Sequence, residues 1–66
     1  MHITVNGKPR EITAPASVTD LLAQLDLHPQ AVVVELNRKI IRRPELADTS
    51  LSDGDVVELV HFVGGG

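Results

Sequence analysis

Hydrophobic and polar residues alternate at the start of the chain, with the period of two that is typical of a half-buried β-strand. Asn6-Gly7 follows and predicts a hairpin, because both residues tolerate positive φ. The pattern predicts strands over residues 1–6 and 10–13. We expect the loop between them to be longer than two residues, because Pro9 cannot donate a hydrogen bond to a strand partner.

A helical period replaces this alternation in the next segment. Ser17 and Asp20 have the spacing of a capping box, in which each side chain accepts a hydrogen bond from the other's backbone N–H. The apolar residues that follow form one stripe: Val18, Leu21, Leu22 and Leu25. The sequence predicts one helix over residues 18–26, closed by Pro29, because the residue before a proline avoids helical dihedral angles. A helix this short must pack on a sheet to be stable.

Strand patterns return in the second half of the chain. A β-branched run over residues 31–37 and the pair Ile40-Ile41 predict two strands joined by a turn. Pro44 predicts a single helical turn over residues 44–47. Asp53-Gly54-Asp55 predicts a tight turn before the last strand, with glycine in the unusual conformation.

The last predicted strand covers residues 56–62. Alternation directs Val57 and Leu59 to the core and places Val60 and Phe62 on the opposite face. By their length, the first and last strands are expected in the middle of the sheet, paired in parallel. The element order predicts an α+β fold, a mixed sheet of four to five strands with one main helix on one face. Residues 1–62 would form this domain, and residues 63–66 a flexible glycine tail.

Composition excludes several classes of function. The chain has 66 residues and no cysteine, so it forms one domain without a disulfide or a thiolate metal site. Its net charge of −3 argues against a nucleic-acid-binding protein. The three histidines match no zinc spacing, and no calcium loop is complete, so we expect no metal. Without a long apolar run or a signal-peptide pattern, we expect no membrane association and a cytoplasmic location.

No catalytic set can be assembled from the polar residues. Ser17 is explained as a helix cap, and no Ser-His-Asp arrangement or phosphate-binding loop is present. We therefore expect no catalytic residue and no bound cofactor in this chain.

Four stretches together resemble a known family: ITVNGKPREI, SVTDLLAQL, VVVELNRKIIRRPE and LSDGDVVELVHFVGGG. The chain resembles ubiquitin-like β-grasp proteins and, more narrowly, the ThiS/MoaD family, in particular its sulfur carriers of thiamine biosynthesis. The last stretch is the most specific, because a strand runs directly into a terminal Gly-Gly. Gly64 is one glycine more than the family motif requires, and Asn37-Arg38-Lys39 is more basic than the Asn-Gly turn expected there.

The resemblance implies that the terminal residue, Gly66, carries sulfur. A ThiF-type adenylyltransferase would use MgATP to adenylate its carboxylate. A persulfide sulfur from a donor such as a cysteine desulfurase would then displace AMP and leave a thiocarboxylate. A ThiG-type thiazole synthase would transfer this sulfur into the thiazole ring of thiamine. Gly64 and Gly65 lack a Cβ, so they would fit a narrow channel in the partner.

Three residues are candidates for the partner interface. Val60 and Phe62 lie beside the tail on the open face of the predicted sheet, and aromatic anchors are enriched at interfaces. The alternative is that Phe62 folds over the sheet edge into the core. Arg42 belongs to a basic cluster that would steer docking to an acidic partner.

Other functions remain open at this point. A sulfur carrier for molybdopterin or another pathway would share the fold and the Gly-Gly end. A ubiquitin-like modifier would instead join Gly66 to target lysines. An interaction domain with an inert glycine tail is the third alternative.

Overall fold

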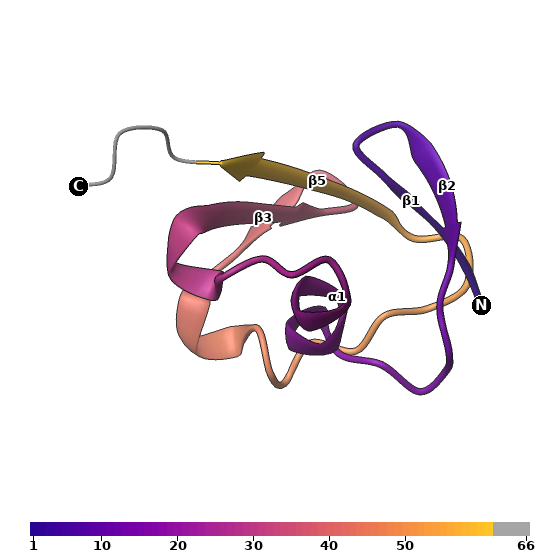
Figure 1. Cartoon of the computed structure of the whole chain (residues 1–66), viewed down its shortest axis with the longest axis horizontal. Helices are drawn as coiled ribbons and strands as arrows, with labels where there is room; N and C mark the ends of the chain where they lie inside the picture. Colours follow the sequence, from indigo (N-terminus) through magenta and orange to yellow (C-terminus); the bar gives the residue numbers. More distant parts are fainter. Residues whose placement is uncertain (62–66) are drawn as a thin grey trace.

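The computed structural model describes residues 1–61 of the chain. In these residues one five-stranded sheet, in the order β2-β1-β5-β3-β4, is covered on one face by a single α-helix (Figure 1). The elements are β1 (His2–Val5), β2 (Lys8–Glu11), α1 (Val18–Gln24), the 3₁₀ turn η1 (Pro29–Ala31), β3 (Val32–Leu36), β4 (Lys39–Ile41), the 3₁₀ turn η2 (Arg43–Glu45) and β5 (Val56–His61). The predicted α+β arrangement is confirmed. The predicted domain boundary after residue 62 lies outside the described residues.

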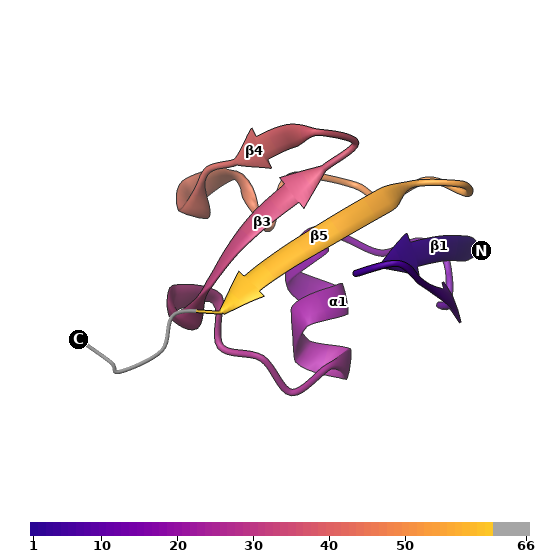
Figure 2. The same ribbon diagram turned by 90° about the horizontal axis from the view of Figure 1, so that it is seen from above.

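Strand β5 lies at the centre of the sheet (Figure 2). It pairs in parallel with β1, where Val5 lies opposite Val57, and antiparallel with β3 along five residue pairs. The predicted parallel pairing of the first and last strands is therefore confirmed. The expectation that the first strand is longer than the other candidates was wrong, because β1 has four residues and β3 has five.

The first hairpin is tighter than predicted. Its loop consists only of Asn6 and Gly7, which have φ angles of 49° and 79°. The expectation of a longer loop was wrong, because Pro9 pairs with Thr4 on an edge strand, where proline is tolerated. Thr4 directs its N–H away from β2, to the carbonyl oxygen of Asp55 at 2.9 Å. This pair therefore requires no donor from the proline.

Two asparagine side chains hydrogen-bond β5 where the neighbouring hairpins turn away. The Asn6 amide accepts from Leu59 N–H at 2.7 Å and donates to the Leu59 carbonyl oxygen at 3.2 Å. On the other edge, Asn37 Oδ1 accepts from Val56 N–H at 2.9 Å, and Asn37 Nδ2 donates to the Asp55 carboxylate at 2.9 Å. Both asparagines have positive φ, which their short polar side chain makes tolerable. Each side-chain amide thus supplies hydrogen bonding to β5 at a position where the neighbouring strand has ended.

The helix begins as the sequence predicted and ends earlier. Ser17 Oγ accepts from Asp20 N–H at 3.2 Å, and Asp20 Oδ2 accepts from Ser17 N–H at 2.9 Å, which completes the capping box. At the other end, Asp26 has a φ of 59°, and Leu27 N–H donates to the Leu22 carbonyl oxygen at 2.8 Å. This is a Schellman-type ending. It closes α1 two residues before the predicted end, without help from the later proline.

The core fills the space between α1 and the sheet. Its buried side chains are Ile3, Val5, Ile12, Ala16, Val18, Leu21, Leu22, Val32, Val34, Leu46, Leu51, Val57 and Leu59. Leu46 follows η2, which begins at Arg43, one residue before the predicted helical turn. In residues 1–61 no helix has the length and apolar character that a membrane crossing requires.

Asn6→Asp tests the side-chain contact with β5. Aspartate keeps the shape and tolerates positive φ, but its carboxylate cannot donate to the Leu59 carbonyl oxygen and repels it. We expect the free energy of unfolding at neutral pH to fall by about 1–2 kcal/mol. Equilibrium denaturation with urea measures this change.

Gln30→Glu is the matched control, because it adds the same charge at an exposed residue. It should change the free energy of unfolding by less than about 0.5 kcal/mol. Equal stability of the Asn6→Asp variant and the unmodified chain would show that the amide contact does not hold the hairpin to β5.

Candidate functional site

Exposed apolar side chains gather on the sheet face opposite α1, which Figure 2 views from above. Among residues 1–61, the most exposed large hydrophobic residues are Ile40, Val60 and Val56, with exposed fractions of 63%, 60% and 44%. All three lie on this face, because each occupies an outward position of its strand. We define the open face as these three residues together with Val33, Glu35 and Glu58. A cluster of exposed apolar residues on a small domain indicates an interaction surface.

The alternation of β5 creates this face. Val57 and Leu59 point into the core, with exposed fractions of 0% and 8%, whereas Val60 points away from it. The predicted positions of these three residues are confirmed. Val60 lies opposite Val33 of β3, so the two valines form one apolar row across the centre of the sheet. That Val60 contacts a partner stays a prediction.

Four of the predicted site residues follow β5 in the sequence. Phe62, Gly64, Gly65 and Gly66 lie outside the described residues, so the predictions about them are not tested by the structure. The last described residue, His61, is exposed and pairs with Val32 at the beginning of β3. Val60, the last residue of the open face on β5, therefore lies directly before His61 and the residues that follow it in the sequence.

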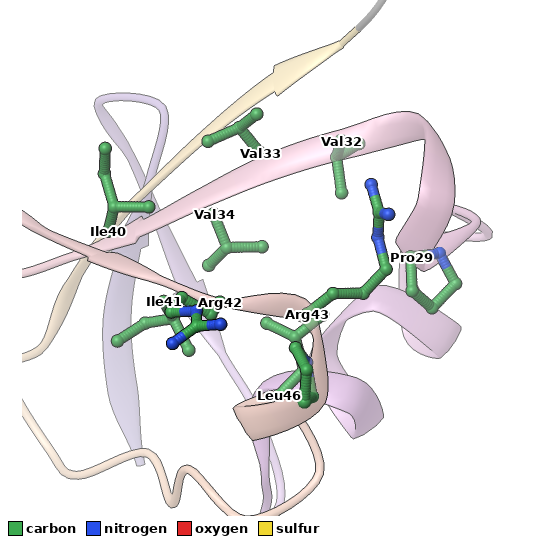
Figure 3. A pocket seen from close by; sticks show the side chains of 10 residues that line it. Pro29, Val32, Val33, Val34, Ile40, Ile41, Arg42, Arg43 and Leu46 are labelled. Atoms are coloured by element: carbon green, nitrogen blue, oxygen red, sulfur yellow. The ribbon is translucent and has the colours of Figure 1, made fainter.

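Arg42 lies at a groove that borders the open face (Figure 3). Val33 and Ile40 belong to both surfaces, so Arg42 and the valine that pairs with Val60 line the same groove. The backbone N–H of Arg42 donates to Glu45 Oε1 at 3.3 Å. The remaining groove residues are Pro29, Val32, Val34, Ile41, Arg43, Pro44 and Leu46. The groove thus combines an apolar lining with two arginines.

Two carboxylates face each other in the middle of the open face. Glu35 of β3 lies directly opposite Glu58 of β5. Among residues 1–61, the only contact at ion-pair distance joins His2 Nε2 and Glu11 Oε1 at 3.1 Å, so no basic side chain there pairs with either glutamate. This pair was not predicted from the sequence. Alternation places each glutamate outside, but only the register of β3 against β5 makes them neighbours.

Asp53 and Asp55 act as turn residues, as the sequence predicted. Asp53 Oδ1 accepts from His2 N–H at 2.7 Å, and Asp55 Oδ2 accepts from Ser52 N–H at 2.7 Å. Gly54 between them has a φ of 88°. In the part of the chain that the structure describes, no three histidine or carboxylate side chains come together as a possible metal site.

Comparison with known proteins gives matches over the whole chain. The model of the ThiS family matches residues 3–66. The sulfur carrier protein ThiS of Bacillus subtilis is 46% identical over 50 residues, which cover 76% of each chain. The crystal structure of the thiamine biosynthesis protein (ThiS) from Geobacter metallireducens has a TM-score of 0.84 and 40% identity, with 100% of both chains covered.

A longer relative matches as well. A thiazole synthase of Paramagnetospirillum magneticum is 36% identical over 66 residues, which are 100% of this chain and 20% of that protein. The chain therefore spans about one fifth of the length of this relative.

Replacing valine by threonine at two positions of β5 tests which residue faces solvent and which faces the core. Threonine keeps the β-branched shape and adds a hydroxyl group. At the exposed Val60 the change should alter the free energy of unfolding by less than about 0.5 kcal/mol. At the buried Val57 it should cost about 1–3 kcal/mol, because the hydroxyl group is removed from water without a ready partner. Urea denaturation of both variants measures the difference, and equal losses would contradict the assignment of the two faces.

Proposed function

This chain belongs to the ThiS family, and from that membership we propose that it is the sulfur carrier of thiamine biosynthesis. It acts as a carrier and co-substrate for enzymes, not as an enzyme itself. The observation that carries the proposal is the family match over residues 3–66, which includes both the strand β5 and the glycine end. The whole-chain likeness to the carrier structure from Geobacter metallireducens supports it.

In the proposed cycle the carboxylate of Gly66 is the reacting group. It attacks the α-phosphorus of ATP in a ThiF-type adenylyltransferase, and pyrophosphate leaves. The acyl adenylate has a good leaving group, which the free carboxylate lacks. The terminal sulfur of a persulfide, formed by a donor such as a cysteine desulfurase, attacks the carbonyl carbon and displaces AMP. Reductive cleavage of the S–S bond by a thiol then leaves the thiocarboxylate.

The rest of this chain supplies position and recognition in the proposal. The absence of cysteine from the sequence is compatible with sulfur carried on a carbonyl carbon. Gly64 and Gly65 have no Cβ, so backbone can pass close to the nucleotide in the partner. Val60 and Phe62 would contact the adenylyltransferase beside this tail, and Arg42 would steer acidic groups of a partner into the adjoining groove.

The sulfur acceptor in the proposal is a ThiG-type thiazole synthase. The relative named thiazole synthase contains a segment similar to the whole of this chain. Joining a carrier-like segment to a synthase would favour direct transfer of sulfur between them, because linkage raises the effective concentration of one at the other. This likeness favours the thiamine pathway over the molybdopterin pathway.

Intact mass spectrometry tests the proposal. The chain ending at Gly66 is incubated with MgATP, a ThiF-type adenylyltransferase, a cysteine desulfurase, cysteine and a thiol reductant. We expect a mass gain equal to the replacement of one oxygen by one sulfur, and no gain after deletion of Gly66. The carrier of Bacillus subtilis in the same mixture is the positive control. No gain in this chain while the control gains sulfur would refute the carrier function.

Addition of a thiazole synthase and its other substrates to the charged chain tests the pathway. The proposal expects return to the original mass together with thiazole formation. Return of the original mass only when a molybdopterin synthase replaces the thiazole synthase would contradict the thiamine assignment. Covalent conjugates to lysine would instead indicate a protein modifier.

A further inference from the structure

We propose that Glu35 and Glu58 determine which partner docks on the open face, and that the adenylyltransferase places an arginine or lysine side chain between them. The inference rests on the proposed function, which supplies the partner. It goes further by giving the chemistry that the partner's surface must have, namely a cation framed by apolar side chains.

The register of the sheet makes this pair unusual. Glu35 and Glu58 are directly opposite on the two central strands β3 and β5. Opposite residues on one face of an antiparallel pair have Cβ atoms about 4.5–5.5 Å apart, and like charges there destabilise the sheet. Charged residues on edge strands protect a sheet from aggregation, but β3 and β5 are not edges. The pair therefore has no protective role of that kind.

No group in the described part of the chain compensates this repulsion. The single contact at ion-pair distance within residues 1–61 is between His2 and Glu11. The side-chain hydrogen bonds of these residues include neither Glu35 nor Glu58. Local features that oppose folding without compensation are expected at functional positions.

The surroundings of the pair specify the occupant. Ile40 lies opposite Glu35 on β4, and the row of Val33 and Val60 lies next to the pair along the strands. Val56, two residues before Glu58 on β5, is on the same face. A cation placed between the carboxylates would be covered by this apolar frame as the partner excludes water. Its attraction to both charges is stronger there than in open solvent, because the local dielectric constant is lower.

This combination favours a protein surface over other ligands. Phosphate-rich partners such as nucleic acids or anionic membranes would be repelled by two carboxylates. A bare metal ion would need more ligands than the two present, and no third carboxylate or histidine of residues 1–61 joins them in a possible metal-binding group. An arginine fits best, because its planar guanidinium can donate to two carboxylates at once while its stem packs on valine and isoleucine side chains.

The test removes each charge while keeping the shape. Glu35→Gln, Glu58→Gln and the double variant are compared with Asp48→Asn, which removes one charge from an exposed residue away from the sheet. Binding to the purified adenylyltransferase is measured without ATP by calorimetric titration at low and high salt. Thermal unfolding of each free variant is measured in parallel.

We expect two effects of opposite sign. The glutamine variants should unfold at a higher temperature than the unmodified chain, because the repulsion is relieved. They should also bind about tenfold more weakly or worse at low salt, with a smaller salt dependence, because a charge pair with the partner is lost. Asp48→Asn should bind like the unmodified chain. A merely structural role would instead make stability and binding change in the same direction.

Unchanged or tighter binding of the double variant would overturn the docking inference. Adenylation of the unmodified chain is measured with MgATP and the same enzyme preparation. It distinguishes a failure of the docking inference from a failure of the proposed function. If the unmodified chain is adenylated and the double variant binds equally well, only the docking inference fails. If the enzyme adenylates the Bacillus subtilis carrier but not the unmodified chain, the proposed function fails, and the docking inference that rests on it fails too.

Discussion

The hydrogen bonding of β5 along both of its edges holds the whole sheet together. β1 and β3 attach to it directly, β2 and β4 attach through those two strands, and the amides of Asn6 and Asn37 extend the contact where the hairpins turn away. The same strand divides the molecule into two functional sides. Its inward residues complete the core under α1, and its outward residues form the centre of the open face. Stability and the proposed recognition of partners therefore depend on the register of a single strand.

Local patterns predicted much of this fold because their causes are local. The capping box at Ser17 and the two faces of β5 follow from residues only a few positions apart, and the structure confirms them. The tightness of the first hairpin was not predictable in this way. It depends on Pro9 lying on an edge strand opposite Thr4, whose N–H donates to Asp55, 51 positions away in the sequence. The Glu35–Glu58 pair was missed for the same reason, since register between distant strands is a tertiary property.

If partners dock on the open face as proposed, this small domain gives up stability for recognition. A 66-residue chain buries only about 60% of the surface that it exposes when unfolded, so each unfavourable feature is a sizeable part of its stability. Exposed valines and an isoleucine, together with two facing carboxylates, are such features. They lie on β5, the strand that leads to the glycine end, and on its neighbours β3 and β4, which is consistent with a carrier whose reacting group is presented to enzymes by docking. In this account the domain orients the terminus, and the partners supply the chemistry.

In the proposed function, the terminal residue Gly66 itself carries the sulfur. Fragmentation of the charged chain in a mass spectrometer, followed residue by residue from both ends, tests it most directly. We expect the added sulfur only in fragments that contain Gly66, and we expect every fragment lacking this residue to have its unmodified mass. Sulfur on fragments without Gly66 would contradict the account, because the reacting group would then be a side chain of the domain.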